Sequence, residues 1–261
     1  MPTPFQLLLF AHSGSIAAAA EAAGVDGLVV DWENRGKDDR QAGFDTEINA
    51  HTREHLRSVR RATTLPIVCR LNGYGPWTAE EIDAALDDGA DELLLPMVRR
   101  PDEAARALDA VRGRAGFGVL IETADAVRCR AALARMPLSR VYVGLNDLAI
   151  DRGSSSIFDA LVDGTVEEVR RDIDVPFGFG GLTVPHLGRP VPCRLLINEM
   201  ARLRCSFSFL RRSFLRDVPP GDFARAAAQI RGALHEASLK PETLLSDGRT
   251  ALAGAIVGAS A

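Results

Sequence analysis

The sequence predicts a parallel α/β barrel of the (β/α)8 type that forms a single domain. Short apolar runs alternate with helical segments, a pattern typical of strands joined by helical crossovers into a parallel sheet. There are eight such runs, and the 261 residues are close to the ~250 of a typical barrel of this kind. The alternative, an open doubly wound sheet, is less favoured because no G-x-G-x-x-G follows the first run.

The eight predicted strands are continuous apolar runs bounded by turn residues, such as FQLLLF and PIVCRL. A run of this kind indicates a strand that is buried on both faces. We place the strands at residues 5–10, 26–31, 66–71, 91–96, 117–122, 140–144, 175–181 and 205–210.

The segments between these strands carry helix signals. Thr78 is predicted to cap a helix over 78–88, with Glu81 three residues later completing a capping box. Pro101 begins the next helix, at the position where its missing N–H costs least. The polar stretch 32–45 is predicted to be a long functional loop. The other helices are predicted at 13–24, 46–62, 124–135, a segment ending near 171, 192–203 and 222–237.

The net charge and the cysteine spacing indicate which partners and which cellular compartment to expect. A net charge of -4 gives no argument for a nucleic-acid or membrane partner. The four cysteines are widely spaced and form no C-x-x-C, and no basic segment precedes the first apolar run, so a reduced cytoplasmic protein is expected. We expect the barrel to occupy residues 1–238. The apolar segment 239–261 is expected to form a tail that is docked, engaged in a subunit contact, or disordered.

Two neighbouring strands are each followed by a carboxylate at their carboxyl ends. Glu122 closes the run VLIE, and Asp147 follows VYVGLN. Residues at the carboxyl ends of barrel strands line the active site, so these two side chains are expected to meet there. Two carboxylates suit a hard divalent cation that keeps water for a substrate to displace. For either residue alone, a loop carboxylate that pairs with an arginine or caps a helix is an equally good interpretation.

The basic residues favour one kind of aldolase chemistry. Lysine occurs only at Lys37 and Lys240, and neither follows a predicted strand, as a Schiff-base lysine would. Arg70 does lie at a strand end. A divalent cation and an arginine together suit a 2-oxo acid, because the metal binds the carboxylate and keto oxygens while arginine stabilises the enolate. Alternatively, Arg70 pairs with Glu122 or Glu33 inside the barrel mouth.

Other strand-end residues are interpreted more simply. His12 is expected to be a rim histidine rather than a catalytic one. Arg211 and Arg212 follow the last predicted strand, and side-chain alternation predicts that at most one of them points into the barrel.

Five segments, in order along the chain, resemble the HpcH/HpaI aldolase and citrate lyase beta superfamily of metal-dependent carbon–carbon lyases. The resemblance covers roughly residues 24–153. The segments are 24–33 (GVDGLVVDWE), 68–72 (VCRLN), 89–98 (GADELLLPMV), 120–123 (LIET) and 144–148 (GLNDL).

The resemblance implies a TIM barrel that assembles as a homo-oligomer, a trimer or a hexamer. It implies Mg2+ or Mn2+ on the positions of Glu122 and Asp147, and substrate binding by Arg70. Glu33 matches the acidic position after the second strand in the citrate lyase branch. The expected substrate contacts are Arg70, Asn72, Gly144 and Asn146.

The chain departs from the family pattern where the acid–base group is concerned. The histidine that follows the second strand in the aldolase branch is replaced by Glu33-Asn34-Arg35. The glutamine two residues before the metal-binding glutamate is Leu120, and the Pro-Lys of the citrate lyase branch is Pro96-Met97. Glu33 or a metal-bound water is therefore the candidate base.

These observations predict a divalent-metal-dependent carbon–carbon lyase or aldolase. It would act through the enolate of a 2-oxo acid of the pyruvate or oxaloacetate type, or of an acyl-CoA. Two alternatives remain open: a related enolate enzyme, such as a decarboxylase or one with phosphoenolpyruvate chemistry, and a non-catalytic barrel of the same fold.

Overall fold

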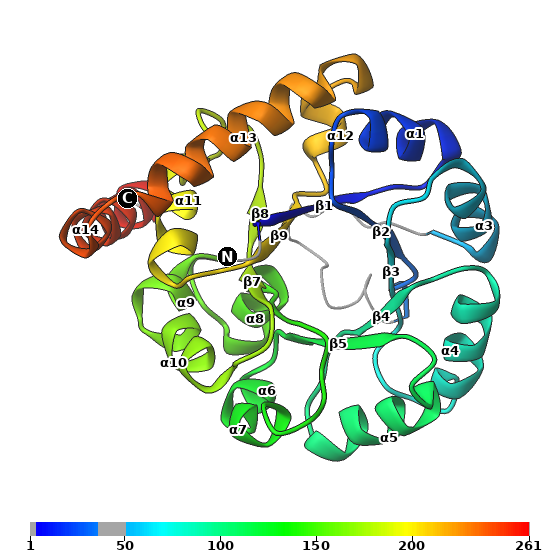
Figure 1. The fold of residues 1–261 in the computed structure, drawn as a ribbon. Coiled ribbons are helices and arrows are strands. Elements are labelled where there is room, and N and C mark those ends of the chain that lie inside the picture. Colours follow the sequence, from blue (N-terminus) through cyan, green and yellow to red (C-terminus); the bar gives the residue numbers. More distant parts are fainter. Residues whose placement is uncertain (1–3, 36–50, 261) are drawn as a thin grey trace.

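The computed structural model describes residues 4–35 and 51–260 and has a ring of parallel strands surrounded by helices (Figure 1). All the strand pairs in the ring are parallel, which confirms the predicted barrel. The strands are β1 (Gln6–Phe10), β2 (Gly27–Asp31), β3 (Ile67–Arg70), β4 (Glu92–Leu95), β5 (Gly116–Ile121), β6 (Val141–Val143), β7 (Phe177–Phe179), β8 (Gly181–Leu182) and β9 (Phe207–Leu210).

The seventh predicted strand is interrupted at Gly180, where φ is 61°. Glycine adopts this left-handed conformation without the steric cost that a side chain would add. On one side of the break β7 pairs with β6, and on the other side β8 pairs with β9. The sheet order is therefore β7-β6-β5-β4-β3-β2-β1-β9-β8, and the two halves of one interrupted strand close the ring.

The strands alternate their side chains between two apolar layers. In β1, Leu7 and Leu9 pack outward among the helices, whereas Leu8 and Phe10 point into the barrel. This explains why the strands read as continuous apolar runs. Tyr142 and Phe209 stack inside the barrel with ring centroids 4.1 Å apart.

The helices form the outer ring (Figure 1). Those of the first half are α1 (Gly14–Ala22), α3 (Arg53–Ala62), α4 (Thr78–Asp87), α5 (Pro101–Val111), α6 (Ala124–Arg128) and α7 (Arg130–Leu133). Those of the second half are α8 (Leu145–Arg152), α9 (Asp159–Val162), α10 (Thr165–Asp172), α11 (Cys193–Arg202), α12 (Phe214–Asp217), the 3-10 turn η1 (Pro220–Asp222), α13 (Phe223–Ser238) and α14 (Glu242–Ser260).

Helix starts test the predicted caps. Pro101 begins α5, as predicted. The predicted capping box of α4 is wrong, because Trp77 is the N-cap and the Thr78 hydroxyl accepts from the Gly75 N–H instead. Glu81 is engaged elsewhere, since its carboxylate accepts hydrogen bonds from Asn72.

The predicted helix 46–62 and the predicted loop 32–45 are only partly covered by the described residues. Helix α3 begins at Arg53 with Thr52 as its cap, later than the predicted start at residue 46. Residues 36–50, with most of the predicted loop and with Lys37, lie outside the described residues.

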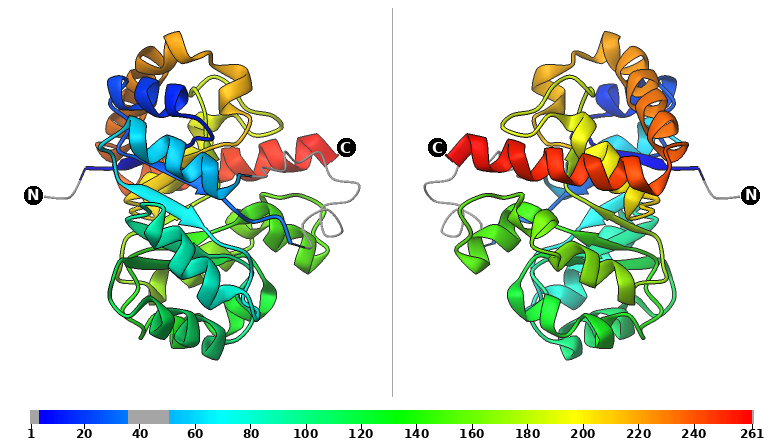
Figure 2. Two further views of the ribbon diagram at one scale, coloured as in Figure 1. Left: turned by 90° about the vertical axis from the view of Figure 1, so that its right-hand side faces the viewer. Right: turned by 90° about the vertical axis from the view of Figure 1, so that its left-hand side faces the viewer.

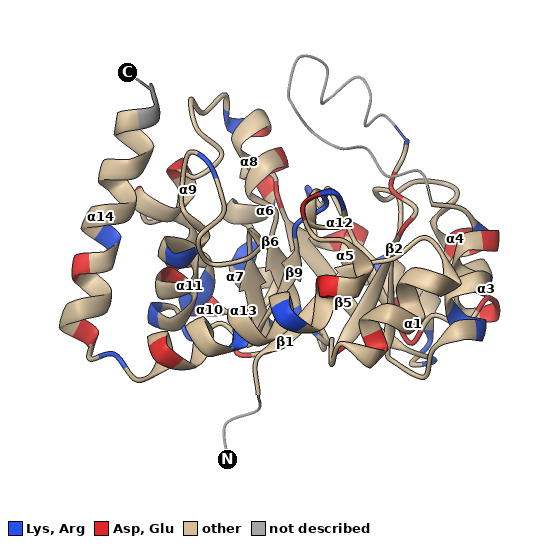
Figure 3. Ribbon diagram, turned by 90° about the horizontal axis from the view of Figure 1, so that it is seen from above, with Lys and Arg blue, Asp and Glu red and all other residues tan. Residues whose placement is uncertain are grey.

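The segment after residue 238 contributes helix α14, which lies along the outside of the barrel beside α11 (Figure 2). Leu245, Leu252 and Ile256 are buried on one side of it. Beyond Arg249 it carries no charged residue, as Figure 3 shows. Across residues 4–35 and 51–260, none of the helices is both long and apolar enough to cross a membrane.

Candidate active site

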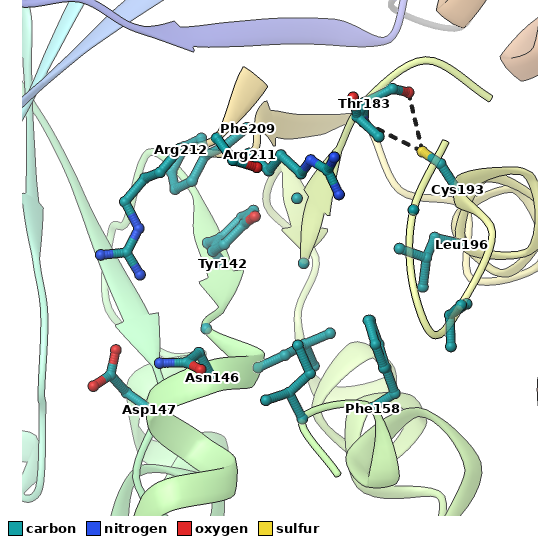
Figure 4. Close-up of a pocket in the computed structure, with 18 of the residues that line it drawn as sticks. Tyr142, Asn146, Asp147, Phe158, Thr183, Cys193, Leu196, Phe209, Arg211 and Arg212 are labelled. Atoms are coloured by element: carbon teal, nitrogen blue, oxygen red, sulfur yellow. Dashed lines mark hydrogen bonds between the residues drawn. The ribbon is translucent and has the colours of Figure 1, made fainter. Parts of the chain in front are cut away.

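A cavity of about 430 Å3 opens at the carboxyl ends of the strands. It brings together residues from distant parts of the chain: Arg70 at the end of β3, Glu122 after β5, Gly144, Asn146 and Asp147 after β6, and Arg211 and Arg212 after β9. Figure 4 shows Asn146, Asp147, Arg211 and Arg212 around this space. The structure therefore places most of the predicted site residues around one space.

Glu122 and Asp147 both line this cavity and are both buried, with 1% and 6% of their surface exposed. The backbone N–H of Met97 donates to Glu122 Oε1 over 2.9 Å and orients the carboxylate. Gly144 packs directly against it, since a Cβ there would lie 2.3 Å from Glu122 Oε2. Gly144 thus provides the space that the glutamate side chain occupies.

Burial raises the pKa of Glu122 to about 8, and the negative charges of Asp147 and Glu33 add to the effect. Arg70 and the Met97 N–H act in the opposite direction. The raised pKa reflects a carboxylate that is desolvated and crowded by like charges. Perturbation of this kind, in a cavity, is a physical mark of a functional site.

Arg70 is held by two carboxylates. Its Nε and Nη2 donate to Asp31 Oδ1 and Oδ2 over 2.8 and 2.6 Å, and its Nη1 lies 3.3 Å from Glu33 Oε2. Although burial disfavours the charge, Asp31 and Glu33 keep the pKa of Arg70 well above its ordinary value. Of the two partners considered from sequence, Glu33 is present, but the bidentate partner is Asp31.

Asp31 was not singled out from the sequence as a partner of Arg70. The signal that could have identified it is strand register, because Asp31 and Arg70 end neighbouring strands and face each other across them. Their side chains therefore start from adjacent positions on the same edge of the sheet.

Asn72 makes its contacts away from the cavity. Its Nδ2 donates to Glu81 Oε1 over 2.7 Å, and its Oδ1 accepts from the backbone N–H groups of Asn34 and Arg35. These bonds fix the backbone that follows Glu33. Neither Glu33 nor Asn72 lines the cavity, so substrate contact by Asn72 and base catalysis by Glu33 stay predictions.

Four carboxylates, from Asp31, Glu33, Glu122 and Asp147, lie near two guanidinium groups, from Arg70 and Arg212. Glu122 is the carboxylate of this set whose pKa is raised, because it is buried beside other negative charges. A divalent cation bound next to it would favour its charged form.

The donors present suit a hard cation. Among the described residues, no group of three or more His, Cys, Asp or Glu is arranged to hold a metal. Glu122 and Asp147 offer two carboxylates, and Mg2+ is commonly bound by one or two carboxylates with water and substrate oxygens in its other positions.

The rings of His12, His51 and His55 lie 5.7 to 6.4 Å apart at the rim but do not suit a metal. The Nδ1 atoms of His51 and His55 accept hydrogen bonds from the backbone N–H groups of Asp31 and Thr52. The proton of each neutral ring is then on Nε2, which leaves no lone pair there for a metal. His12 does not line the cavity.

The cavity extends well beyond the carboxylate pair, toward apolar side chains that include Phe158 and Leu196. Three buried side-chain atoms on its lining have no hydrogen-bond partner among the described residues: Asn146 Nδ2, Thr183 Oγ1 and Arg211 Nε. A polar ligand would satisfy such atoms. Thr183 was not recognised from the sequence, which has no family match in this region.

Both arginines after β9 line the cavity. The strand ends at Leu210, and the Phe214 N–H donates to the Arg211 carbonyl, which makes a turn. Alternation applies only within the strand. The two side chains diverge, with Arg212 directed toward Asp147 and Arg211 toward Thr183 (Figure 4).

Sequence comparisons give limited matches. No protein-family model matches the chain. Indole-3-glycerol phosphate synthase of Aromatoleum aromaticum is 29% identical over 173 residues, 66% of this chain and 59% of that protein. A type III pantothenate kinase of Mycobacteroides abscessus is 42% identical over 78 residues, 29% of this chain and 28% of that protein. The chain thus spans less than two thirds of the length of either relative.

Solved structures give broader matches. The citrate synthase SbnG aligns with a TM-score of 0.59 at 17% identity, over 79% of this chain and 85% of that one. An HpcH/HpaI aldolase/citrate lyase family protein from Burkholderia cenocepacia J2315 aligns with a TM-score of 0.58 at 20% identity, over 89% of this chain and 94% of that one. RipC from Yersinia pestis aligns with a TM-score of 0.55 at 17% identity, over 92% of this chain and 98% of that one. At identities of 17 to 20%, these similarities show that the chain shares the barrel fold of these proteins.

Proposed function

We propose that this chain is a divalent-metal-dependent carbon–carbon lyase or aldolase of the HpcH/HpaI aldolase and citrate lyase superfamily. Its substrate would be a small molecule that forms an enolate, either a 2-oxo acid of the pyruvate or oxaloacetate type or an acyl-CoA. The observation that carries the proposal is the convergence of Glu122, Asp147 and Arg70 on one cavity at the carboxyl ends of the strands.

Glu122 and Asp147 are the proposed ligands of Mg2+ or Mn2+. When bound, the cation would hold the carboxylate and keto oxygens of the substrate and favour the enolate. Met97 and Gly144 hold Glu122 in one orientation, the first by a hydrogen bond and the second by leaving room for it. The site is thus preorganised, so that little reorganisation is needed when charge develops on the substrate.

Arg70 supplies fixed positive charge at the same place. Asp31 binds its Nε and Nη2, which sets the plane of the guanidinium group. Glu33, the candidate base, contacts Arg70 but does not line the cavity. We therefore propose that Glu33 influences the substrate at least in part by setting the position and charge of Arg70.

Cavity size favours a lyase or aldolase over an enzyme that handles a three-carbon acid alone. The volume of about 430 Å3 leaves room for a second reacting fragment beside the enolate. A non-catalytic barrel is disfavoured because Glu122, a buried carboxylate whose pKa is raised to about 8, would destabilise the fold without a compensating function.

A homo-oligomer, either a trimer or a hexamer, is part of the proposal, while nucleic acid and membrane are not proposed as partners. Val257 on α14 is 70% exposed and Leu244 is 53% exposed. Apolar side chains presented in this way on a projecting helix support a subunit contact there.

The first experiment is calorimetric titration of Mg2+ or Mn2+, with and without pyruvate or oxaloacetate. The wild type is compared with Glu122→Gln/Asp147→Asn and with the surface control Asp83→Asn/Asp102→Asn. We expect metal binding that strengthens with the 2-oxo acid, is lost in the site variant and is kept in the control. Absence of metal binding in the wild type would remove this mechanism and leave the non-catalytic barrel as the better account.

A further inference from the structure

Arg212 belongs to the same charged cluster as the proposed metal ligands. It lines the cavity, and its guanidinium group is directed toward Asp147 and Asn146 (Figure 4). Burial and the nearby Arg70 lower the pKa of Arg212, while Asp31, Asp147 and Glu33 oppose that change. Arg212 is therefore a second guanidinium group at the end of the cavity where the enolate would form.

The turn after β9 fixes this position. The Arg211 N–H donates to the Leu182 carbonyl over 2.8 Å, and the Phe214 N–H donates to the Arg211 carbonyl over 2.8 Å. The Phe214 ring is buried and anchors the turn in the core. The backbone of Arg212 is thus held between the last strand and a packed aromatic side chain, as a preorganised binding residue requires.

Arg70 is already engaged with protein carboxylates. Its Nε and Nη2 bond to Asp31, and its Nη1 lies near Glu33, so all three of its nitrogen atoms face protein oxygens. The three side chains together carry a formal charge of one negative unit. Part of the positive charge of Arg70 is therefore offset by Asp31 and Glu33 before any substrate binds.

We propose that Arg212 is a substrate-binding residue that stabilises the enolate, a task that the sequence motifs assign to Arg70 alone. The inference rests on the proposed function. As the carbon–carbon or carbon–hydrogen bond breaks, its electron pair forms the C=C bond of the enolate and the carbonyl π pair moves onto the oxygen. The departing carbon leaves as a carbonyl compound, or the proton passes to the base. An N–H of Arg212 donates a hydrogen bond to that oxygen, and no bond to Arg212 itself is made or broken.

The test uses two probes that differ in charge. Oxalate is a planar dianion that resembles the enolate of pyruvate, and pyruvate resembles the ground state. Both are titrated by calorimetry in the presence of Mg2+ into the wild type, Arg212→Gln and Arg212→Lys. The control is Arg225→Gln, which removes an arginine on α13 that is 72% exposed and does not line the cavity.

In Arg212→Gln we expect oxalate affinity to fall roughly 10- to 100-fold, the size of one lost charge-assisted hydrogen bond. Pyruvate affinity should fall by about threefold or less, because only an interaction that strengthens with enolate charge discriminates between the probes. Mg2+ alone should bind as tightly or more tightly, since a positive charge near Asp147 is gone. The ratio of oxalate to pyruvate affinity should be intermediate in Arg212→Lys and unchanged in Arg225→Gln.

Equal weakening of oxalate and pyruvate, or no change in either, would overturn the role of Arg212. If Arg212→Gln also loses Mg2+ binding, the Arg212→Lys variant is used for the comparison instead. An unchanged ratio of oxalate to pyruvate affinity in Arg212→Lys would then overturn the proposed role of Arg212. Failure of the proposed function looks different, because the wild type would then show no metal-dependent binding of either probe. Metal-independent oxalate binding that disappears in Arg212→Gln would keep the role of Arg212 and reject the metal mechanism.

Discussion

At the scale of single residues, Glu122 is a carboxylate whose burial disfavours its negative charge. Its carboxylate is desolvated and lies near Asp147 and Glu33, which raises its pKa to about 8. In the unfolded chain the same group titrates near the ordinary value of 4.5. Since the folded-state pKa is higher, this residue takes stability away from the metal-free protein as pH rises from about 4.5 to 8.

We therefore predict that Glu122→Gln stabilises the metal-free protein at pH 8 and has no such effect at pH 4. We expect the free energy of unfolding to rise by about 1 kcal/mol or more at pH 8. Each kcal/mol corresponds to roughly 2–4 °C in Tm for a chain of this size. The measurement is a thermal melt in EDTA at both pH values. The same variant should lose the Mg2+-induced rise in Tm that the wild type shows. A lower Tm for Glu122→Gln at pH 8 would contradict the assignment of a strained carboxylate.

Asp31 illustrates the opposite case, a buried charge that is matched. Asp31→Asn removes one member of the bidentate pair and leaves Arg70 buried with only Glu33. We expect a loss of about 3 kcal/mol or more in the free energy of unfolding, measured by urea denaturation. The exposed Asp102, paired with Arg100 and Arg106, is the control, and Asp102→Asn should cost about 0.5 kcal/mol or less. Similar losses in the two variants would show that the Arg70 pair is not specially stabilising.

At the scale of elements, the interrupted strand β7–β8 is where the barrel closes. Gly178 lies so close to β9 that a Cβ there would be 2.2 Å from the Phe207 carbonyl oxygen. Backbone cannot move aside as the end of a flexible side chain can. The glycine is thus needed for the close approach of β7 to β9.

Gly178→Ala is accordingly predicted to destabilise the protein by about 2 kcal/mol or more, because the two strands must separate. Gly232, on helix α13, has nothing near its missing Cβ. Gly232→Ala should stabilise by roughly 0.5–1 kcal/mol through helix propensity. Urea denaturation of both variants checks the contrast, and a tolerated Gly178→Ala would refute the close-packing account.

At the scale of the whole molecule, α14 presents the exposed apolar side chains of Leu244 and Val257. Under the proposed homo-oligomer, Val257→Glu should shift the sedimentation of the protein from a trimer or hexamer toward the monomer, because a charge would enter an apolar contact. Leu239 is 71% exposed between α13 and α14 and provides the control, so Leu239→Glu should leave the assembly intact. An unchanged assembly in Val257→Glu would place the contact elsewhere.

Sequence patterns alone predict the barrel and the edge of the sheet at which the candidate site lies. Continuous apolar runs predicted strands buried on both faces, and parallel strands end on one edge, so Arg70, Glu122 and Asp147 could be expected to converge. These inferences need only local pattern and strand direction. They do not need the position of any side chain.

Which groups interact at that edge becomes known only from the three-dimensional structure. It gave Asp31 rather than Glu122 as the bidentate partner of Arg70, and it brought both Arg211 and Arg212 to the cavity. The structure also showed that the seventh predicted strand is interrupted at Gly180. These features depend on distances of a few ångströms and on desolvation between residues far apart in the chain, and no local sequence pattern records either quantity.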